Sequence, residues 1–333
     1  MRRLPLLLAV LALCACAPAG HTQGRTGAIT VKAQTLPMDP THPSADRIGD
    51  FRYAGGLWLT SPDTSLLGGL SDLKVDARGD LTSETDEGSL LRAHIVLDAQ
   101  GRLLGLDHAS IVALTGPDGG PLDGKTEADA EGVAVWPNAD LMVSFERNHR
   151  IWIYPSTGGP PRAAPMPLVP MPNNEGMEGL TLATSQGPDA YWVGIEGGSI
   201  WLCRLAAGCQ QWPRLPSPPL GYRLTALAET GSGDLVILHH SYNPFSGQSR
   251  VRATLVKIPK GPAASAAVEA RLEIGPPLTV DNLEGVAAVR SPRGGLRLYL
   301  ISDDNFSARQ RTLLLAFDWM GPGAGRPAPL ATR

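Results

Sequence analysis

A hairpin-like segment recurs five times along the 333-residue chain, and this repeat limits the folds that the chain can adopt. The clearest copy, EGVAVWPNADLMVSFE, runs from Glu131 to Glu146, with two apolar runs separated by a Pro-Asn turn. Apolar alternation on both sides of such a turn is typical of a β-hairpin. The other copies cover residues 71–86, 178–196, 225–240 and 284–303.

Each hairpin is followed by a third apolar run and often by a weaker fourth one. Successive units begin 47 to 60 residues apart. Units of about 40–50 residues with four strands are typical of a β-propeller. The sequence therefore predicts an all-β propeller domain over residues 28–325, which follows a signal peptide (1–15) and a tether (16–27).

The blade count depends on the strands that precede the first repeat, near residues 28–36 and 51–61. These strands must belong to the ring, and the last strand, near residues 313–319, can pair with them to close it. Closure of this kind removes exposed sheet edges. We expect six four-stranded blades, with five as the alternative.

The N-terminus resembles a bacterial lipoprotein signal, because a basic start precedes an apolar run that ends at LCAC, residues 13–16. The run is too short for a typical membrane span. Cleavage before Cys16 would leave this cysteine to carry the lipids, whereas an ordinary secretory signal would be cut near Ala17 to Ala19. We expect a periplasmic protein of the cell envelope that meets the membrane only through its lipid anchor.

Two further cysteines, Cys203 and Cys209, lie six residues apart. Export to an oxidising compartment favours a small disulfide loop between them, and two reduced buried thiols are the alternative. The spacing is not C-x-x-C, which argues against redox catalysis. The net charge of −3 gives no basis for nucleic-acid binding, and we expect a monomer.

Two positions of the repeat hold most of the acids. The first position starts the inner strand, and the second ends the next strand. Because these two points are adjacent in an antiparallel hairpin, both sets should form rings near one mouth of the central channel. The first ring contains Ser71, Glu131, Glu178, Thr225 and Glu284, and the second contains Asp86, Glu146, Glu196, His240 and Asp303.

Crowded carboxylates repel one another, and burial makes their charge more costly. A cation can relieve both effects. Calcium accepts six to eight oxygen ligands in flexible geometry, whereas zinc sites prefer Cys and His. The predicted calcium ligands are Glu131, Glu178, Glu284, Asp86, Glu146 and Asp303. Alternatively, each Glu-Gly pair is local architecture, in which the Gly permits a tight backbone and the Glu binds backbone N–H groups or an arginine.

The loops that follow the second ring are basic, and arginine suits bidentate contact with phosphate or carboxylate. We predict that Arg150, Arg309 and His149 bind the substrate. Catalytic roles are predicted for His240, Glu196 and Arg147. The alternative is that the arginines pair with ring acids or are merely exposed.

At these residues the chain resembles the phytase-like propeller family, described as "esterase-like activity of phytase". The matching segments are GGLSDL from Gly68, DAEGVAVWPNADLMVSFERNHRIW from Asp129, NNEGMEGLTL from Asn173, DNLEGVAAV from Asp281 and LYLISDDNFSARQRTLLLAF from Leu298. The resemblance covers roughly residues 50–320 and implies a propeller, export, and phosphoester or ester hydrolysis with calcium. Two departures from the family pattern are His239-His240, in place of Glu-Arg, and SETDEG from Ser83, in place of a Ser-Asp pair and a basic residue.

The expected function is therefore a phosphoric-ester hydrolase that uses calcium on phytate, a smaller phosphate ester or another ester. A serine esterase is a weaker version, because the chain has no G-x-S-x-G elbow. The alternative is a non-catalytic propeller of the cell envelope that binds a ligand or a protein, since a fold does not fix a function.

Overall fold

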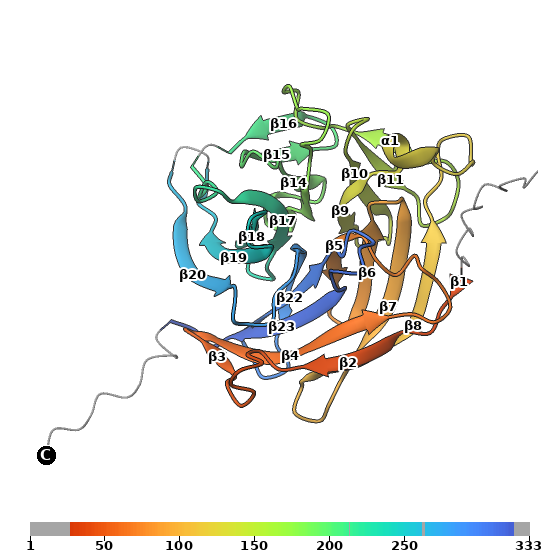
Figure 1. Ribbon diagram of the computed structural model, residues 1–333. Coiled ribbons are helices and arrows are strands. Elements are labelled where there is room, and N and C mark those ends of the chain that lie inside the picture. The colour runs from red at the N-terminus through yellow and green to blue at the C-terminus, as the bar shows by residue number, and fades with distance from the viewer. Residues whose placement is uncertain (1–26, 213, 262–263, 323–333) are drawn as a thin grey trace, which may run out of the picture.

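The computed structural model describes residues 27–212, 214–261 and 264–322. The predicted signal peptide and Cys16 lie outside these residues. Five sheets surround a central axis, so the fold is a β-propeller, as predicted (Figure 1). No helix within the described part of the chain is long and apolar enough to cross a membrane.

In each of the first four blades, the strands follow one another from the axis outward in chain order. Blade one contains β5 (Leu70–Val75), β6 (Asp80–Thr85), β7 (Ser89–Leu97) and β8 (Leu103–Ala113), with the short β1 (Gly27–Ala28) at its outer edge. Blade two contains β9 (Ala130–Val135), β10 (Leu141–Phe145), β11 (Arg150–Tyr154) and β12 (Arg162–Ala164). The helix α1 (Gly124–Ala128) lies between these two blades in the chain.

Blades three and four repeat the same meander. Blade three contains β13 (Gly179–Leu182), β14 (Ala190–Gly194), β15 (Ile200–Arg204) and β16 (Gly208–Gln211), with the 3₁₀ turn η1 (Thr184–Gln186) between its first two strands. Blade four contains β17 (Arg223–Glu229), β18 (Leu235–Asn243), β19 (Gln248–Lys257) and β20 (Ala267–Ile274). All five predicted hairpins are therefore present as the two inner strands of the five blades.

The fifth blade joins the two ends of the described chain, and it corrects the favoured blade count. Its inner strands are β21 (Leu283–Arg290), β22 (Leu296–Ser302) and β23 (Leu313–Trp319). The strands β4 (Phe51–Thr60) and β2 (Lys32–Leu36) follow on the outside, and β3 (Arg47–Ile48) also pairs with β4. The prediction of six blades is wrong and the alternative of five is correct, because β4 covers the open edge of β23 instead of starting a separate blade.

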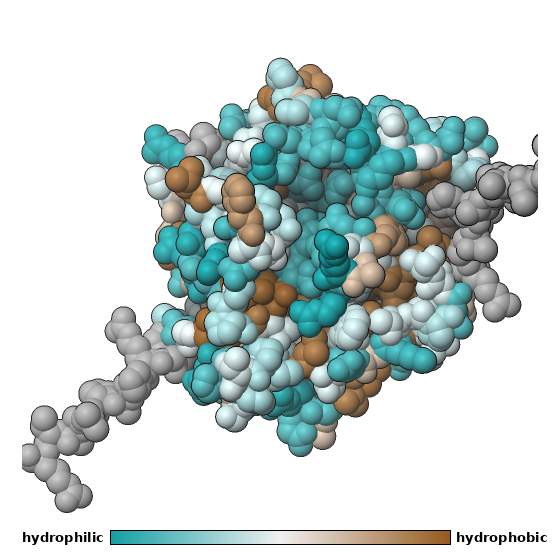
Figure 2. All heavy atoms as spheres, in the orientation of Figure 1, coloured by the Kyte–Doolittle hydropathy of each residue, from teal (hydrophilic) through white to brown (hydrophobic). Residues whose placement is uncertain are grey.

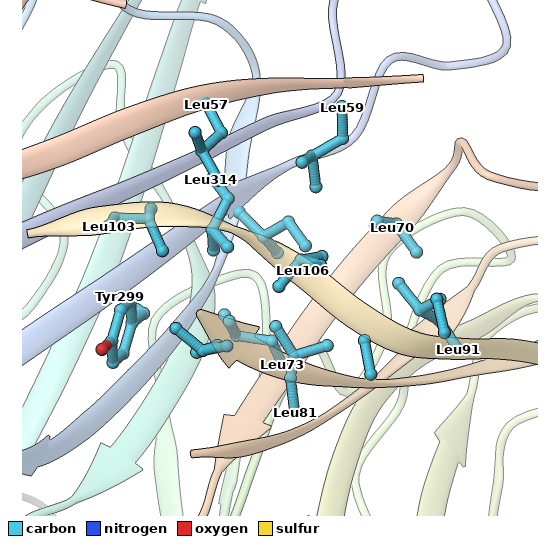
Figure 3. Packing of buried hydrophobic residues seen from close by; sticks show 14 of the residues in the cluster. Leu57, Leu59, Leu70, Leu73, Leu81, Leu91, Leu103, Leu106, Tyr299 and Leu314 are labelled. Atoms are coloured by element: carbon cyan, nitrogen blue, oxygen red, sulfur yellow. The ribbon is translucent and has the colours of Figure 1, made fainter. Parts of the chain in front are cut away.

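Apolar side chains pack blade five against blade one and hold this closure (Figure 3). Leu57 in β4, Leu314 in β23 and Leu73 in β5 are fully buried in this cluster. Full burial of one such side chain contributes about 1.5–3 kcal/mol. The pairing of distant chain ends is therefore supported by the core as well as by the β-ladder.

The predicted disulfide between Cys203 and Cys209 is present. The two cysteines are opposite each other in the β15–β16 hairpin of blade three. The bond therefore closes the outer hairpin of this blade and takes no part in the channel.

Candidate functional site

The first ring position is the extra residue of a β-bulge in four of the five blades. In β9, Gly132 pairs with Ser144 and Ala130 pairs with Phe145, so Glu131 has no partner in the register. The same irregularity skips Ser71 in β5, Thr225 in β17 and Glu284 in β21. In blade three, Glu178 directly precedes β13. A bulge turns a side chain out of the regular alternation of a strand, and bulges are frequent beside active sites.

The glycine that follows a ring glutamate has an architectural role. A Cβ on Gly132 would lie 2.8 Å from the carbonyl oxygen of Glu178, and one on Gly285 would lie 2.8 Å from the Cα of Asp72. The first contact reaches the residue directly before β13 and the second reaches β5, so any side chain at these positions would push neighbouring blades apart. Local architecture therefore explains the glycine of the Glu-Gly pair, and it also involves one glutamate, because Glu284 Oε1 accepts a hydrogen bond from Asn282 Nδ2 at 2.9 Å.

A repeated backbone hydrogen bond fixes the second ring position. In four blades, the backbone N–H of the second-ring residue donates to the backbone carbonyl of the residue two positions before the first-ring residue. The N–O distances are 2.8–3.0 Å. The donors are Asp86, Glu146, Glu196 and Asp303, and the acceptors are Gly69, Asp129, Gly176 and Asn282. In blade four, His240 pairs in register with the equivalent residue, Arg223. The two ring positions are therefore adjacent in every blade.

The two rings meet in one cavity of about 490 Å³. Nine of the ten ring residues line it, and the exception is Ser71, which is buried. Figure 2 shows a hydrophilic hollow near the middle of the face that it presents. The predicted metal ligands and the predicted catalytic residues His240, Glu196 and Arg147 all line the cavity.

Burial and mutual repulsion disfavour charge on the ring carboxyls. Burial, followed by the charge of neighbouring carboxylates, raises the pKa values of Glu131, Glu178 and Glu284 well above their usual range. Burial also raises the pKa of Glu146 to about 7 and that of Asp303 to about 7. Without a cation, the cavity must therefore keep several of these groups protonated near neutral pH.

Three carboxylates around blade two lie closest together. Asp129, Glu131 and Glu146 each place one oxygen within 4.8 Å of the others. Calcium–oxygen distances are about 2.3–2.6 Å, so two oxygens that share a calcium ion can lie up to about 5 Å apart. The spacing and the oxygen-only donor set therefore fit a calcium ion.

Sequence reasoning missed Asp129 as a candidate ligand. Its position two residues before the first ring is filled by Gly69, Gly176, Arg223 and Asn282 in the other blades, so the repeat did not mark it as acidic. Its position directly before an inner strand, inside the quoted DAEG segment, was the available signal.

Two cationic side chains already pair with acids at the cavity. Lys125, from α1, contacts Asp86 and lies 2.8 Å from Asp129 Oδ1. Arg147 Nε lies 2.5 Å from Asp129 Oδ2, and its Nη2 donates to Asn174 Oδ1 at 2.8 Å. Asp129 is thus a buried carboxylate that joins both cations to the acid cluster. Lys125 could not be predicted from the repeat, because α1 lies outside it.

A third cation, Arg223, lies at the blade-four side of the cavity and was also missed. Its Nη1 is 3.1 Å from Glu175 Oε1, and its Nε is 3.4 Å from Glu196 Oε1. Glu196 Oε2 is buried and has no hydrogen-bond partner among the described residues. One oxygen of Glu196 is therefore oriented by a guanidinium, and the other has no hydrogen-bond partner among the described residues.

The three predicted substrate-binding side chains do not line the cavity. The guanidinium of Arg150 packs over the rings of Phe145, at 4.0 Å, and Trp152, at 4.2 Å. His149 bonds to a backbone carbonyl through Nε2 at 3.0 Å, and Arg309 is exposed in the loop before β23. The geometry gives no support to substrate binding by these three residues.

Blade four contributes an uncharged stretch of wall. Its ring residues are Thr225 and His240, which are followed along the cavity by Ser241 and Tyr242. Thr225 Oγ1 and His240 Nε2 are buried and have no hydrogen-bond partner within the described structure. Burial lowers the pKa of His240 to about 4, so the imidazole is neutral at pH 7.

Comparison with known proteins identifies a family. A family model described as "Phytase-like: Esterase-like activity of phytase" matches residues 65–306. No curated protein matches the chain.

Several solved structures are similar at low identity. Virginiamycin B lyase from Staphylococcus aureus is 10% identical, with a TM-score of 0.42 over 87% of this chain and 99% of that chain. A protein of unknown function from Bacteroides thetaiotaomicron is 9% identical, with a TM-score of 0.44 over 87% and 76% of the two chains. Aldose sugar dehydrogenase from Streptomyces coelicolor is 14% identical, with a TM-score of 0.38 over 87% and 99%. These similarities say nothing about the chemistry of the cavity.

Proposed function

The chain belongs to the phytase-like family described by the esterase-like activity of phytase, and from that premise we propose that it hydrolyses small phosphate esters with the help of calcium. The observation that carries the proposal is the acid cluster of Asp129, Glu131 and Glu146, whose oxygens lie within 4.8 Å of one another. The cluster lies in a cavity that also contains arginines and an unpaired carboxylate oxygen.

The three residues of this cluster would hold the calcium, with Glu178 and Glu284 beside them. Glu178 and Glu284 both raise the pKa of Glu131, and Glu284 also raises the pKa of Glu178, so they belong to the same crowded group. When bound, calcium supplies positive charge that polarises a phosphoryl or carbonyl oxygen. The histidine and cysteine ligands that zinc prefers are not part of the cluster.

Glu196 is our choice for the general base. Its Oε2 is unpaired among the described residues, and burial raises its pKa, which makes it a better proton acceptor at neutral pH. His240, with a pKa of about 4, is a weak base and is left to form hydrogen bonds. Arg147 lies beside the cluster, where its guanidinium can contact the oxygens that gain negative charge.

The test uses the purified chain with Cys16→Ser, assayed on a broad panel of phosphate and carboxylic esters with calcium or with a chelator. We expect turnover that depends on calcium. Glu196→Gln should lower kcat by roughly 10²–10⁴-fold, the usual contribution of a general base. The matched control is Glu269→Gln, an exposed glutamate in β20 that should keep full activity. Absence of turnover across the panel in both conditions would refute the proposal.

A non-catalytic binding propeller is the second candidate, and one observation favours it. Lys125, Arg147 and Arg223 are each paired with an acid, as expected if these ion pairs only stabilise the rim of the central channel. Calcium that raises the melting temperature without any turnover would favour this candidate.

We also propose that the protein is exported and lipid-anchored in the cell envelope through Cys16. The support is the LCAC segment at residues 13–16 and the apolar run before it. Incorporation of labelled palmitate into the parent chain, and its loss in Cys16→Ser, is the expected result.

A further inference from the structure

We propose that blade four binds the alcohol part of the substrate, and that this part is uncharged and carries hydroxyl groups. The inference rests on the proposed esterase function, and it narrows the substrate class. It comes from the difference between blade four and the other four blades, each of which places at least one carboxylate of the two rings in the cavity.

The cavity is divided by charge. Seven ring carboxylates line it, namely Asp86, Glu131, Glu146, Glu178, Glu196, Glu284 and Asp303. At the same two positions, blade four presents Thr225 and His240. The only charged residue of β17 that lines the cavity, Arg223, pairs with Glu175 and Glu196. A ligand that spans the cavity therefore meets carboxylates from four blades, and at blade four it meets the neutral side chains of Thr225 and His240 beside the paired Arg223.

Two buried polar atoms on the neutral surface lack partners. Thr225 is 8% exposed and His240 is 9% exposed, and both Thr225 Oγ1 and His240 Nε2 have no hydrogen-bond partner in the described residues. An unsatisfied buried polar group costs about 1–3 kcal/mol. Ligand hydroxyl groups that bond to these atoms would remove this cost, and both atoms belong to adjacent strands of the cavity wall, Thr225 to β17 and His240 to β18.

The chemistry of these atoms selects the ligand group. A threonine hydroxyl both donates and accepts, and a neutral imidazole has one donor and one acceptor. Neither supplies the positive charge that a phosphate needs, whereas a hydroxyl group donates and accepts in the same way. Ser241 adds another hydroxyl, and the ring of Tyr242, which is 56% exposed, offers an apolar face with a polar edge at the rim.

The carboxylates in the rest of the cavity limit the number of phosphate groups that the substrate can carry. Each additional phosphate brings further negative charge toward seven carboxylates that already repel one another. A singly phosphorylated polyol or sugar therefore fits better than a polyphosphorylated one. A volume of about 490 Å³ is within the usual range of small-molecule pockets.

The experiment compares kcat/KM for glycerol phosphate, n-butyl phosphate and phytate, with the purified chain in calcium. Glycerol phosphate should be the best of the three. Thr225→Val replaces the hydroxyl with a methyl group of similar size and should lower the glycerol-to-butyl ratio roughly 3- to 10-fold, the value of one hydrogen bond. Thr225→Ser keeps the hydroxyl and should keep the ratio. This variant tests whether the effect of Thr225→Val comes from the lost hydroxyl rather than from misfolding. Thr254→Val, a buried threonine in β19 outside the cavity, is the matched control.

A second measurement separates this inference from the esterase proposal. Saturation-transfer NMR with free glycerol, without calcium or phosphate, should show contact with the parent chain and a weaker signal with Thr225→Val. If esters are hydrolysed but glycerol phosphate has no advantage and Thr225→Val leaves the ratio unchanged, the neutral surface binds only water and this inference is overturned. If no ester is hydrolysed but glycerol binds in a Thr225-dependent way, the esterase proposal fails and the hydroxyl-binding surface stands.

Discussion

Gly132 lies against the backbone of Glu178, so that a Cβ on Gly132 would be only 2.8 Å from the carbonyl oxygen of Glu178. This contact joins the Glu-Gly pair of blade two to that of blade three. The glycine of one pair makes room for the next ring glutamate, and the bulge at Glu131 releases its side chain from the strand register. The repeated pair therefore serves both the packing of the blades and the construction of the cavity.

Gly132→Ala should destabilise the propeller without adding a charge or removing a polar group. The new methyl would also lie 2.6 Å from Ser144 Oγ and 2.9 Å from Leu180 Cβ. Overpacking of this kind costs about 1–3 kcal/mol, measured as the free energy of unfolding in denaturant. The control is Gly105→Ala in β8, where a Cβ would meet nothing within 4 Å. Equal denaturation midpoints for Gly132→Ala and Gly105→Ala would contradict the close packing of the inner strands.

The sequence predicted the hairpins and both rings because these features repeat, and repetition separates a pattern from chance. It did not predict the blade count, which depends on where β4 pairs. The pattern of β4 suits an outer strand of blade five or of a separate blade equally well. The ladder between β4 and β23, together with the packing of Leu57 in the core shared by blades one and five, distinguishes the two.

Residues that occur in a single blade were the hardest to predict. The position of Asp129 is not acidic in the other blades, and Lys125 lies in α1, outside the repeat, so the repeat could not mark either residue. Arg150 was predicted to face a substrate because it follows the second ring in the chain. In the structure its guanidinium instead packs on Phe145 and Trp152, an interaction that depends on side-chain direction.

Calcium should stabilise the folded chain, because a ligand that binds only the folded state raises the free energy of unfolding. At a concentration of 100 times Kd, the gain is about 2.7 kcal/mol. Glu131→Gln should remove most of the calcium-dependent shift in melting temperature, since it deletes a charge from the closest acid cluster. Glu269→Gln, on the exposed side of β20, should keep the full shift. A parent protein whose melting temperature is the same in calcium and in chelator would not fit this expectation.

The stability of the calcium-free chain should decrease as the pH rises. Glu146 has an ordinary pKa of 4.5 and a folded pKa of about 7, so the folded state binds its proton more tightly than the unfolded state does. The resulting stabilisation is complete below the unfolded value and is lost as the pH rises toward about 7. The side chain in Glu146→Gln cannot ionise. In chelator, the free energy of unfolding of this variant should therefore increase relative to that of the parent as the pH rises from about 4 to 7. Denaturation at several pH values measures this difference, and a difference that does not change with pH would argue against it.

The closure of the ring should depend on Arg297 in β22 and Asp318 in β23. Their side chains are 0% and 2% exposed and form a two-pronged ion pair, with Nε–Oδ1 at 2.7 Å and Nη2–Oδ2 at 2.9 Å. Because β23 also pairs with β4, this ion pair lies beside the junction of the two chain ends.

Arg297→Met should lower the free energy of unfolding by about 3–5 kcal/mol, because it leaves the charge of Asp318 buried without a partner. The double variant Arg297→Met with Asp318→Leu should recover much of this loss, since it removes both charges. Arg290→Met, at the exposed end of β21, is the matched control and should unfold like the parent. If Arg297→Met is as stable as this control, the closure does not rely on the ion pair and rests on the ladder between β4 and β23 and on the apolar packing of β4.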